Sequence, residues 1–130
     1  MSSPHNPAKT KVLVVDDEAI IADTLALILN KSGFQATAAY RGPQAVRLAA
    51  QSSPDVLLID IVMGDMTGID TARMIAKAHP KCRILFISGH GDAEGMVNRH
   101  ADGMNCRLLP KPLRPEDLLA ELRDPHRCAA

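Results

Sequence analysis

Residues 11–17 read Lys-Val-Leu-Val-Val-Asp-Asp, an apolar run that ends in two adjacent carboxylates. A continuous apolar run is typical of a strand that a parallel sheet buries on both faces. At the carboxyl end of such a strand, Asp16 and Asp17 repel each other and lose hydration. Magnesium relieves this cost, because it prefers oxygen ligands and keeps several waters. The stretch therefore predicts a buried strand with a divalent-cation site at its end.

A second apolar run, residues 56–59, also ends in an acid, Asp60, and strand and helix patterns alternate along the chain. We expect strands at 11–15, 34–38, 55–59, 82–87 and 106–109. We expect helices at 18–31, 44–50, 69–78, 92–101 and 115–123. This order requires parallel strands joined by helical crossovers. The predicted fold class is therefore α/β, a doubly wound parallel sheet of five strands with helices on both faces.

Charged and hydroxyl side chains follow the predicted strands. In parallel sheets of this kind, ligands bind at the carboxyl ends of the strands, where the strand order reverses. Asp16, Asp17 and Asp60 belong to that edge, and Ser88 and Lys111 follow the fourth and fifth strands. The sequence thus predicts that these five side chains share one site.

The composition fits one domain. The chain has 130 residues, of which 46% are hydrophobic, and its 15 Lys and Arg balance its 15 Asp and Glu. Bulk charge therefore favours neither nucleic acid nor a membrane surface, and no apolar stretch reaches the roughly 20 residues of a membrane span. Three cysteines without metal-ligand spacing indicate reduced thiols, so we expect a cytoplasmic location without membrane insertion. We expect residues 1–10 to be a flexible leader, 11–123 the domain and 124–130 a short tail.

The three acids indicate a metal site that contains a reactive carboxylate. Asp60 is a candidate nucleophile that attacks phosphorus and forms an acyl phosphate. Asp17, Asp60 and a backbone carbonyl of the following loop, that of Val62, are the expected Mg²⁺ ligands. Asp16 is expected to act through a bound water. Bound magnesium screens the repulsion between carboxylate and phosphoryl oxygens.

Ser88 and Lys111 are candidates for holding the phosphoryl oxygens, one through a hydroxyl and the other through a compact positive charge. Each polar residue taken alone also has an ordinary interpretation. Asp16 and Asp17 are favoured helix-capping residues, Ser88 precedes a glycine as in many turns, and Lys111 is a solvated charge. Their occurrence together at one sheet edge favours phosphoryl chemistry.

Four short motifs end the predicted strands: Val-Val-Asp-Asp-Glu at 14–18, Leu-Ile-Asp-Ile-Val-Met at 58–63, Ile-Ser-Gly at 87–89 and Leu-Pro-Lys-Pro-Leu at 109–113. With these motifs the chain resembles a receiver domain of a two-component response regulator, similar to the chemotaxis regulators. The resemblance implies a flavodoxin-like fold with strand order 2-1-3-4-5 and a cis bond between Lys111 and Pro112. It also implies that a histidine kinase or a histidine phosphotransfer protein phosphorylates Asp60 with Mg²⁺ as cofactor.

The sequence departs from that family at the position three residues before Lys111. Receivers commonly carry Phe or Tyr there, and the ring moves when the site is phosphorylated. This chain has Leu108 instead, and no aromatic residue follows Phe86. An aromatic switch on the fifth strand is therefore impossible, and the signal must be read through other side chains. We expect output through protein contacts with an unidentified downstream protein, without direct binding to nucleic acid.

Several alternatives remain open beside a free-standing, non-enzymatic receiver. The chain can be a receiver fragment of a larger response regulator or of a hybrid kinase. It can also be a phosphatase or phosphotransferase with an aspartyl-phosphate intermediate. Such enzymes carry Asp-x-Asp after the first strand, whereas Asp16 and Asp17 are adjacent here. A flavodoxin-like cofactor protein would need a Ser/Thr/Gly-rich phosphate-binding loop after the first strand, where this chain has acidic residues. An adaptor that is never phosphorylated would not need the complete five-residue set.

Overall fold

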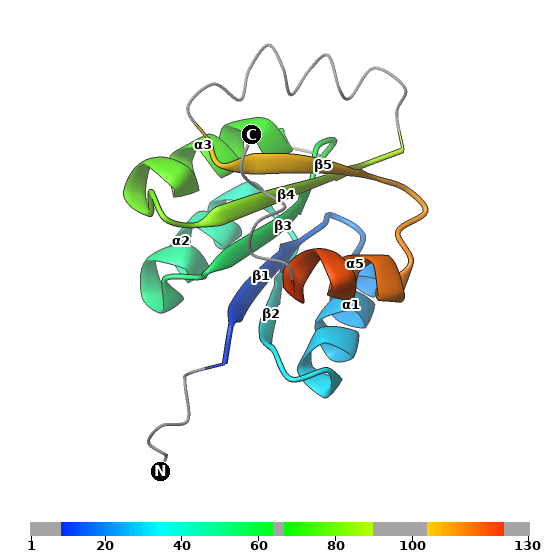
Figure 1. The fold of residues 1–130 in the computed structure, drawn as a ribbon. Coiled ribbons are helices and arrows are strands. Elements are labelled where there is room, and N and C mark those ends of the chain that lie inside the picture. Colours follow the sequence, from blue (N-terminus) through cyan, green and yellow to red (C-terminus); the bar gives the residue numbers. More distant parts are fainter. Residues whose placement is uncertain (1–8, 64–66, 90–103, 124–130) are drawn as a thin grey trace.

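The structure is a computed structural model that describes residues 9–63, 67–89 and 104–123 (Figure 1). Between residues 11 and 88, strands and helices alternate as the sequence predicts. The strands are β1 (Lys11–Val15), β2 (Gln35–Ala39), β3 (Val56–Asp60), β4 (Arg83–Ser88) and β5 (Cys106–Pro110). The helices are α1 (Ala19–Lys31), α2 (Gly42–Ser52), α3 (Gly68–Ala78) and α5 (Pro115–Arg123). The helix expected at 92–101 lies outside the described residues.

The five strands form one parallel sheet in the order β2-β1-β3-β4-β5. Both the fold class and the strand order are therefore confirmed. The order reverses between β1 and β3, because β2 lies on one side of β1 and every later strand lies on the other. The carboxyl ends of β1 and β3 are thus neighbours at the reversal, where folds of this kind bind ligands.

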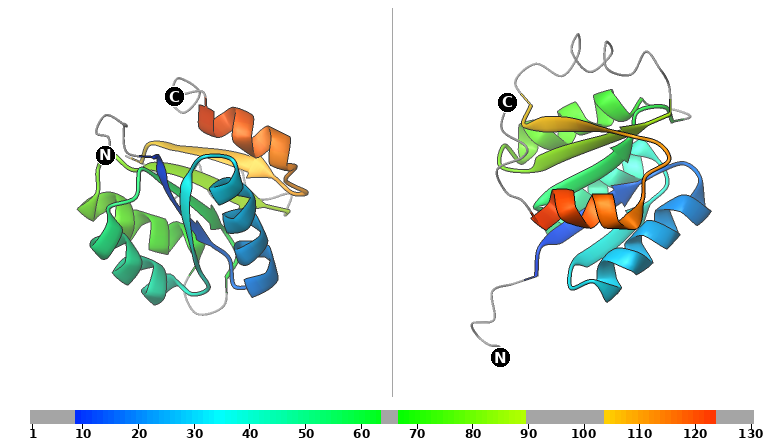
Figure 2. Two further views of the ribbon diagram at one scale, coloured as in Figure 1. Left: turned by 90° about the horizontal axis from the view of Figure 1, so that it is seen from below. Right: turned by 45° about the vertical axis from the view of Figure 1, so that its right-hand side comes forward.

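Helices cover both faces of the sheet: α2 and α3 lie on one face and α1 and α5 on the other (Figure 2). The alternation of side chains along β1 explains how one strand serves both layers. Leu13 and Val15 pack in the cluster beneath α2 and α3, and Val12 and Val14 pack in the cluster beneath α1 and α5. The apolar runs of β1, β3 and β4 are needed because both of their faces are covered.

The edge strand β2 is only half buried, and a side chain covers part of its edge. The amide of Asn30, near the end of α1, both donates to the Ala36 carbonyl (3.1 Å) and accepts from the Ala36 N–H (2.9 Å). Asn30 thereby replaces the strand that is missing on this side. Such protection blunts an edge that could otherwise pair with another chain.

Within the described residues, the predicted boundaries lie within two residues of the observed ones, and one difference concerns the site. Asp60 and Ser88, expected just after their strands, are the last residues of β3 and β4. Their backbones are therefore part of the sheet. The second helix is also longer than expected and begins at Gly42, with Pro43 in its first turn. In the described part of the chain, no helix is long and apolar enough to cross a bilayer.

Candidate functional site

Three carboxylates meet at the reversal point of the sheet. Asp16 and Asp17 follow β1 and Asp60 ends β3, and oxygen atoms from the three lie within 4.8 Å of one another. Asp16 and Asp60 are buried, whereas Asp17 is exposed. Within the described ranges, this is the one group of acidic, His or Cys side chains close enough to hold a metal ion.

One buried oxygen of Asp16 accepts no hydrogen bond from the described residues. Its Oδ1 accepts the backbone N–H of Glu18 at 2.9 Å, and its own N–H donates to the Ala39 carbonyl at 3.2 Å. Its Oδ2 has no hydrogen-bond partner among the described residues, and the Lys111 Nζ is 3.8 Å away. A buried carboxylate oxygen without a partner is costly, and a hard cation or its bound water would satisfy it. The donor set therefore fits a divalent cation.

The surroundings of Asp16 disfavour its charged form. Burial raises the pKa of Asp16 above its ordinary value, and the nearby charges of Asp60 and Asp17 add to that rise. The Glu18 amide and the charge of Lys111 act in the opposite direction without cancelling it. A divalent cation would favour the ionised form of the same carboxyl.

Asp60 is held at both of its oxygens. Oδ1 accepts the backbone N–H of Val62 at 3.2 Å, and Oδ2 accepts the Nζ of Lys111 at 3.0 Å. The carboxylate is therefore oriented before any ligand arrives. Val62 belongs to the loop beside the acids and is exposed.

Lys111 reaches the acids from the loop after β5. Its backbone N–H donates to the Ser88 carbonyl at 2.9 Å, and its peptide bond to Pro112 is cis. Burial lowers the pKa of Lys111, but the hydrogen bond to Asp60 and the carboxylate charges outweigh burial, so its pKa lies above the ordinary value. Lys111 thus remains a cation that compensates the two buried acids.

Ser88 and Leu108 take the places that the strand order gives them. Ser88 is buried at the end of β4, in register with Pro110, which precedes Lys111. Leu108 pairs with Phe86 and packs partly buried against the cluster beneath α2 and α3. The structure therefore brings all five predicted polar residues to one edge and places an aliphatic side chain at the switch position.

Gly68 is a site residue whose role the sequence does not reveal. Its N–H donates to the Ile61 carbonyl at 2.8 Å, so the start of α3 lies directly against the end of β3. A Cβ at this position would lie 1.9 Å from the Asp60 carbonyl oxygen, far inside van der Waals contact. Glycine is required because the two backbones touch, and not because of a left-handed turn. The only available signal in the sequence is a glycine directly before the helix predicted at 69–78.

Comparison with known protein sequences agrees with the resemblance found in the four motifs. Residues 12–123 match the family described as response regulator receiver domain. The DNA-binding response regulator MtrA of Mycolicibacterium paratuberculosis is 30% identical over 115 residues, covering 88% of this chain and 50% of that protein. The chain thus spans about half the length of the curated relatives it matches.

Solved structures agree with the sequence relatives. The Vibrio cholerae chemotaxis protein CheY4 superposes with a TM-score of 0.80 and 29% identity, over 89% of this chain and 98% of that one. A Burkholderia pseudomallei response regulator protein, solved with a phosphorylated aspartic acid, calcium ion and citrate, has a TM-score of 0.78 and 28% identity, over 88% and 67%. Fold, motifs and the match over 12–123 together show that this chain belongs to the response regulator receiver domain family of two-component signalling.

Proposed function

We propose that Asp60 is the phosphoacceptor of a Mg²⁺-dependent signalling switch. The observation that carries this proposal is that three carboxylates meet where a buried Asp16 oxygen has no partner among the described residues, beside an Asp60 that Lys111 already orients. The similar Burkholderia pseudomallei protein, with its phosphorylated aspartic acid and calcium ion, supports the same chemistry. The proposed role is signalling, not turnover of a small substrate.

Magnesium, when bound, supplies positive charge that screens the repulsion between the carboxylates and an incoming phosphoryl group. We assign its ligands to Asp17, Asp60 and the Val62 carbonyl, with Asp16 acting through a water. The arrangement of these residues around the unused Asp16 oxygen supports this assignment. The acids also explain why a phosphate alone would be repelled from this edge of the sheet.

In the proposed transfer, an Asp60 oxygen attacks phosphorus, and the bond between phosphorus and the donor's imidazole nitrogen breaks. The imidazole leaves with the electron pair, and an acyl phosphate remains on Asp60. Lys111 and Ser88 hold the phosphoryl oxygens, Lys111 by its charge and Ser88 by its hydroxyl. A histidine kinase or a histidine phosphotransfer protein is the proposed donor.

We assign residues 11–123 to the receiver domain, and residues 1–10 and 124–130 to flanking segments. A cytoplasmic location and an output through protein contacts fit a domain of this family. The relative MtrA is a DNA-binding regulator about twice as long as the matched region. A receiver within a longer, DNA-binding regulator is therefore the second candidate arrangement, in which another part of the protein would contact nucleic acid.

The test is incubation of the full chain with acetyl phosphate, with and without Mg²⁺, followed by intact mass analysis. Wild type gains one phosphoryl mass when Mg²⁺ is present, and Asp60→Asn gains none. The matched control is Asp70→Asn, since Asp70 is an exposed acid on α3 whose carboxylate lies 3.5 Å from Arg73. A phosphoryl mass on Asp60→Asn, or none on wild type at any Mg²⁺ concentration, would overturn the proposal.

A further inference from the structure

The outer edge of β2 presents backbone groups that do not bond to β1. The backbone N–H of Gln35 and the carbonyl of Ala39 form hydrogen bonds toward β1, at 2.9 and 3.2 Å. Backbone groups alternate in direction along a strand, so those of Ala36, Ala38 and Tyr40 face away from the sheet. These outward groups form the edge at which another strand could pair.

Two side-chain amides occupy the ends of this edge. Asn30 of α1 donates to the Ala36 carbonyl at 3.1 Å and accepts the Ala36 N–H at 2.9 Å. At the other end, the side-chain oxygen of Gln44 accepts the Tyr40 N–H at 2.8 Å. Ala38 lies between these capped residues, and no side chain of the described residues bonds to it. The edge is therefore closed at both ends and open at its centre.

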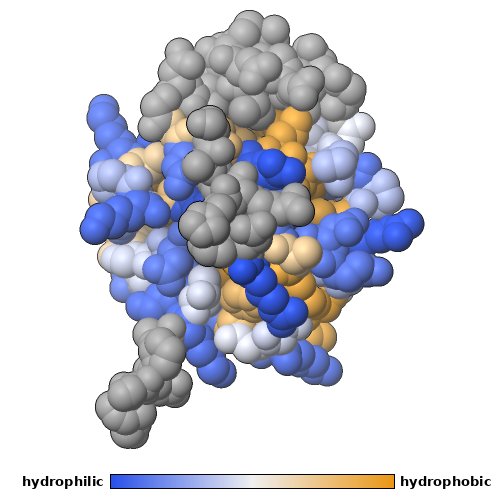
Figure 3. Space-filling model, in the orientation of Figure 1, coloured by the Kyte–Doolittle hydropathy of each residue, from blue (hydrophilic) through white to orange (hydrophobic). Residues whose placement is uncertain are grey.

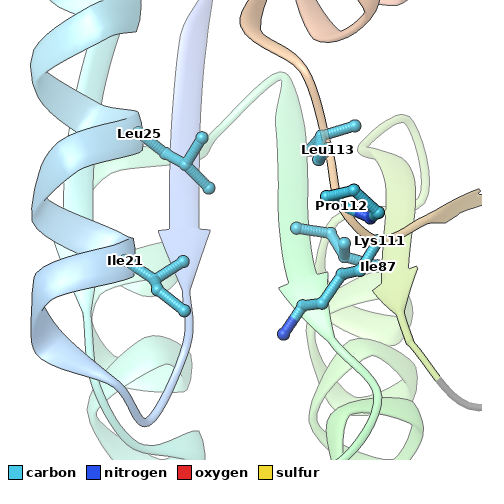
Figure 4. Close-up of a pocket in the computed structure, with 6 residues that line it drawn as sticks. All are labelled: Ile21, Leu25, Ile87, Lys111, Pro112 and Leu113. Carbon is cyan, nitrogen blue, oxygen red and sulfur yellow. The ribbon is translucent and has the colours of Figure 1, made fainter.

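One side of α1 runs along the same edge. Asp23 accepts a hydrogen bond from the Tyr40 hydroxyl, and Asn30 bonds to Ala36. Leu27 lies between Asp23 and Asn30 at helical spacing and is 55% exposed. Apolar surface is exposed in the part of the molecule where α1 and α5 lie (Figure 3), whereas the two α1 side chains drawn in Figure 4 point toward the loop after β5. A strand added to β2 would thus pass beside an exposed apolar side chain.

The sequence of β2 lacks the usual protections of an edge strand. Lysine, proline and bulges are the common devices that prevent edge-to-edge pairing. Residues 35–39 read Gln-Ala-Thr-Ala-Ala and contain no charged residue and no proline. The strand also pairs with β1 in unbroken register, without a bulge. The amides of Asn30 and Gln44 therefore provide the protection that the strand itself does not.

We propose that the β2 edge is a self-pairing surface for a second copy of this chain, in antiparallel register centred on Ala38, and that Asn30 and Gln44 hold it closed. The edge is self-complementary, because a two-fold axis at Ala38 places Ala36 of one copy opposite Tyr40 of the other. Both flanking pairs then meet the two amides, and only the pair at Ala38 remains available. This inference is independent of the proposed function of Asp60.

The test compares the self-association of full-chain variants by sedimentation equilibrium over a wide range of concentration. Asn30→Ala removes both hydrogen bonds to Ala36, and we expect its association constant to exceed that of wild type by at least about tenfold. Adding Gln44→Ala should raise association further, because the second cap is also removed. The matched control is Gln51→Ala, which removes an exposed amide of α2 away from the edge and should behave as wild type.

Two further measurements locate the contact. Thr37 is exposed on β2, so Thr37→Lys adds a charge beside the edge and should weaken the association of Asn30→Ala by about tenfold. Amide hydrogen exchange of Ala38, followed by NMR, should slow in the associated state because its N–H enters a hydrogen bond. Circular dichroism checks that each variant is folded, and Asn30→Ser replaces Asn30→Ala should the latter not fold.

The inference is overturned if both Asn30→Ala and its double variant with Gln44→Ala stay monomeric at every concentration. Association of wild type equal to that of Asn30→Ala would also overturn it, because Asn30 would then not close the edge. So would a dimer in which Ala38 exchange is unchanged or which Thr37→Lys does not weaken, since the contact would lie elsewhere. None of these outcomes involves phosphorylation, so they are separate from failure of the proposed function.

Discussion

Lys111 holds its ammonium nitrogen 3.0 Å from Asp60 and 3.8 Å from Asp16, so one cation compensates two buried acids. A bound divalent cation would act on the same oxygens. On the proposed function, Lys111 and a bound Mg²⁺ would repel each other before phosphorylation and would act together once a phosphoryl group adds negative charge. The proposed function therefore predicts that Lys111 influences both the affinity for Mg²⁺ and the rate of phosphorylation.

Lys111→Met is expected to bind Mg²⁺ several-fold more tightly than wild type, because a competing positive charge is removed. The same variant should lose about 100-fold in the rate of phosphorylation by acetyl phosphate, as when one stabilising donor is removed. Calorimetric titration measures the first effect and intact mass the second. Lys77→Met, on the exposed last turn of α3, is the control. Metal affinity that falls in Lys111→Met would contradict the competition argued above.

Gly68 and Gly89 form a matched pair for a second prediction. A Cβ at Gly68 would overlap the Asp60 carbonyl oxygen, whereas one at Gly89 would meet the Lys111 side chain at an ordinary 3.6 Å. Gly68→Ala is expected to lower the free energy of unfolding by about 3 kcal/mol through overpacking against a rigid strand. Gly89→Ala should change it by less than about 1 kcal/mol. Urea unfolding measures the free energy of unfolding of both variants. Equal decreases would show that close contact with β3 is not why position 68 requires glycine.

Among the elements, α5 is tied to the sheet by a buried charge as well as by apolar contacts. Glu121 is buried and accepts from Arg83 of β4 at 2.9 Å, and its other carboxylate oxygen lies 3.1 Å from Arg107 of β5. Arg83 also donates to the Glu121 carbonyl at 2.9 Å. Leu118 and Leu122 complete the contact with the cluster beneath α1 and α5. The charges thus fix α5 relative to two strands at once.

Glu121→Ala is expected to cost about 3–5 kcal/mol, because it leaves the buried Arg83 without its counter-charge. The double variant Arg83→Met, Glu121→Leu should regain most of that loss, since Arg107 is 41% exposed and can be hydrated. Arg73→Ala breaks the exposed pair with Asp70 and should cost at most about 1 kcal/mol. Chemical unfolding of the four proteins gives the comparison. A double variant no more stable than Glu121→Ala would mean that Glu121 acts through packing, not through charge.

Different physical effects decided what was predictable from the sequence. Apolar runs ending in Asp16, Asp17 and Asp60 place these acids at one edge, because parallel strands share their direction. The contact between Lys111 and Asp60 also needs β5 beside β4, and the family resemblance supplied that order. The role of Gly68 depends on how closely the start of α3 approaches the end of β3, and the role of Glu121 depends on contact with Arg83, 38 residues away. The pattern of neighbouring residues in the sequence does not indicate such contacts.

At the scale of the whole molecule, the buried charge of Asp16 lowers the free energy of unfolding, and a bound cation would offset this loss. The pKa of Asp16 is raised, mainly by burial, so the folded state holds this proton more tightly than the unfolded chain does. Between the ordinary pKa of 3.8 and the raised folded pKa, the folded state therefore binds more protons, and stability falls as pH rises. At pH values above the folded pKa of Asp16, the ionised carboxylate lowers the free energy of unfolding by its full amount. At pH values below 3.8, Asp16 is protonated in both the folded and the unfolded chain, so this loss of stability disappears.

Asp16→Asn is therefore expected to be more stable than wild type without Mg²⁺ at neutral pH, by about 1 kcal/mol, as is common where a functional site is relieved of strain. The amide can still accept from the Glu18 N–H, so the local backbone is preserved. The advantage should shrink as the pH falls below the Asp16 window, where wild type is protonated. Saturating Mg²⁺ should also reduce it, because the cation stabilises the folded wild type by mass action. Urea unfolding at neutral and acidic pH, with and without Mg²⁺, measures all four conditions. A variant less stable than metal-free wild type at neutral pH would mean that Asp16 is favourably ionised by Lys111, and that the site imposes no such cost.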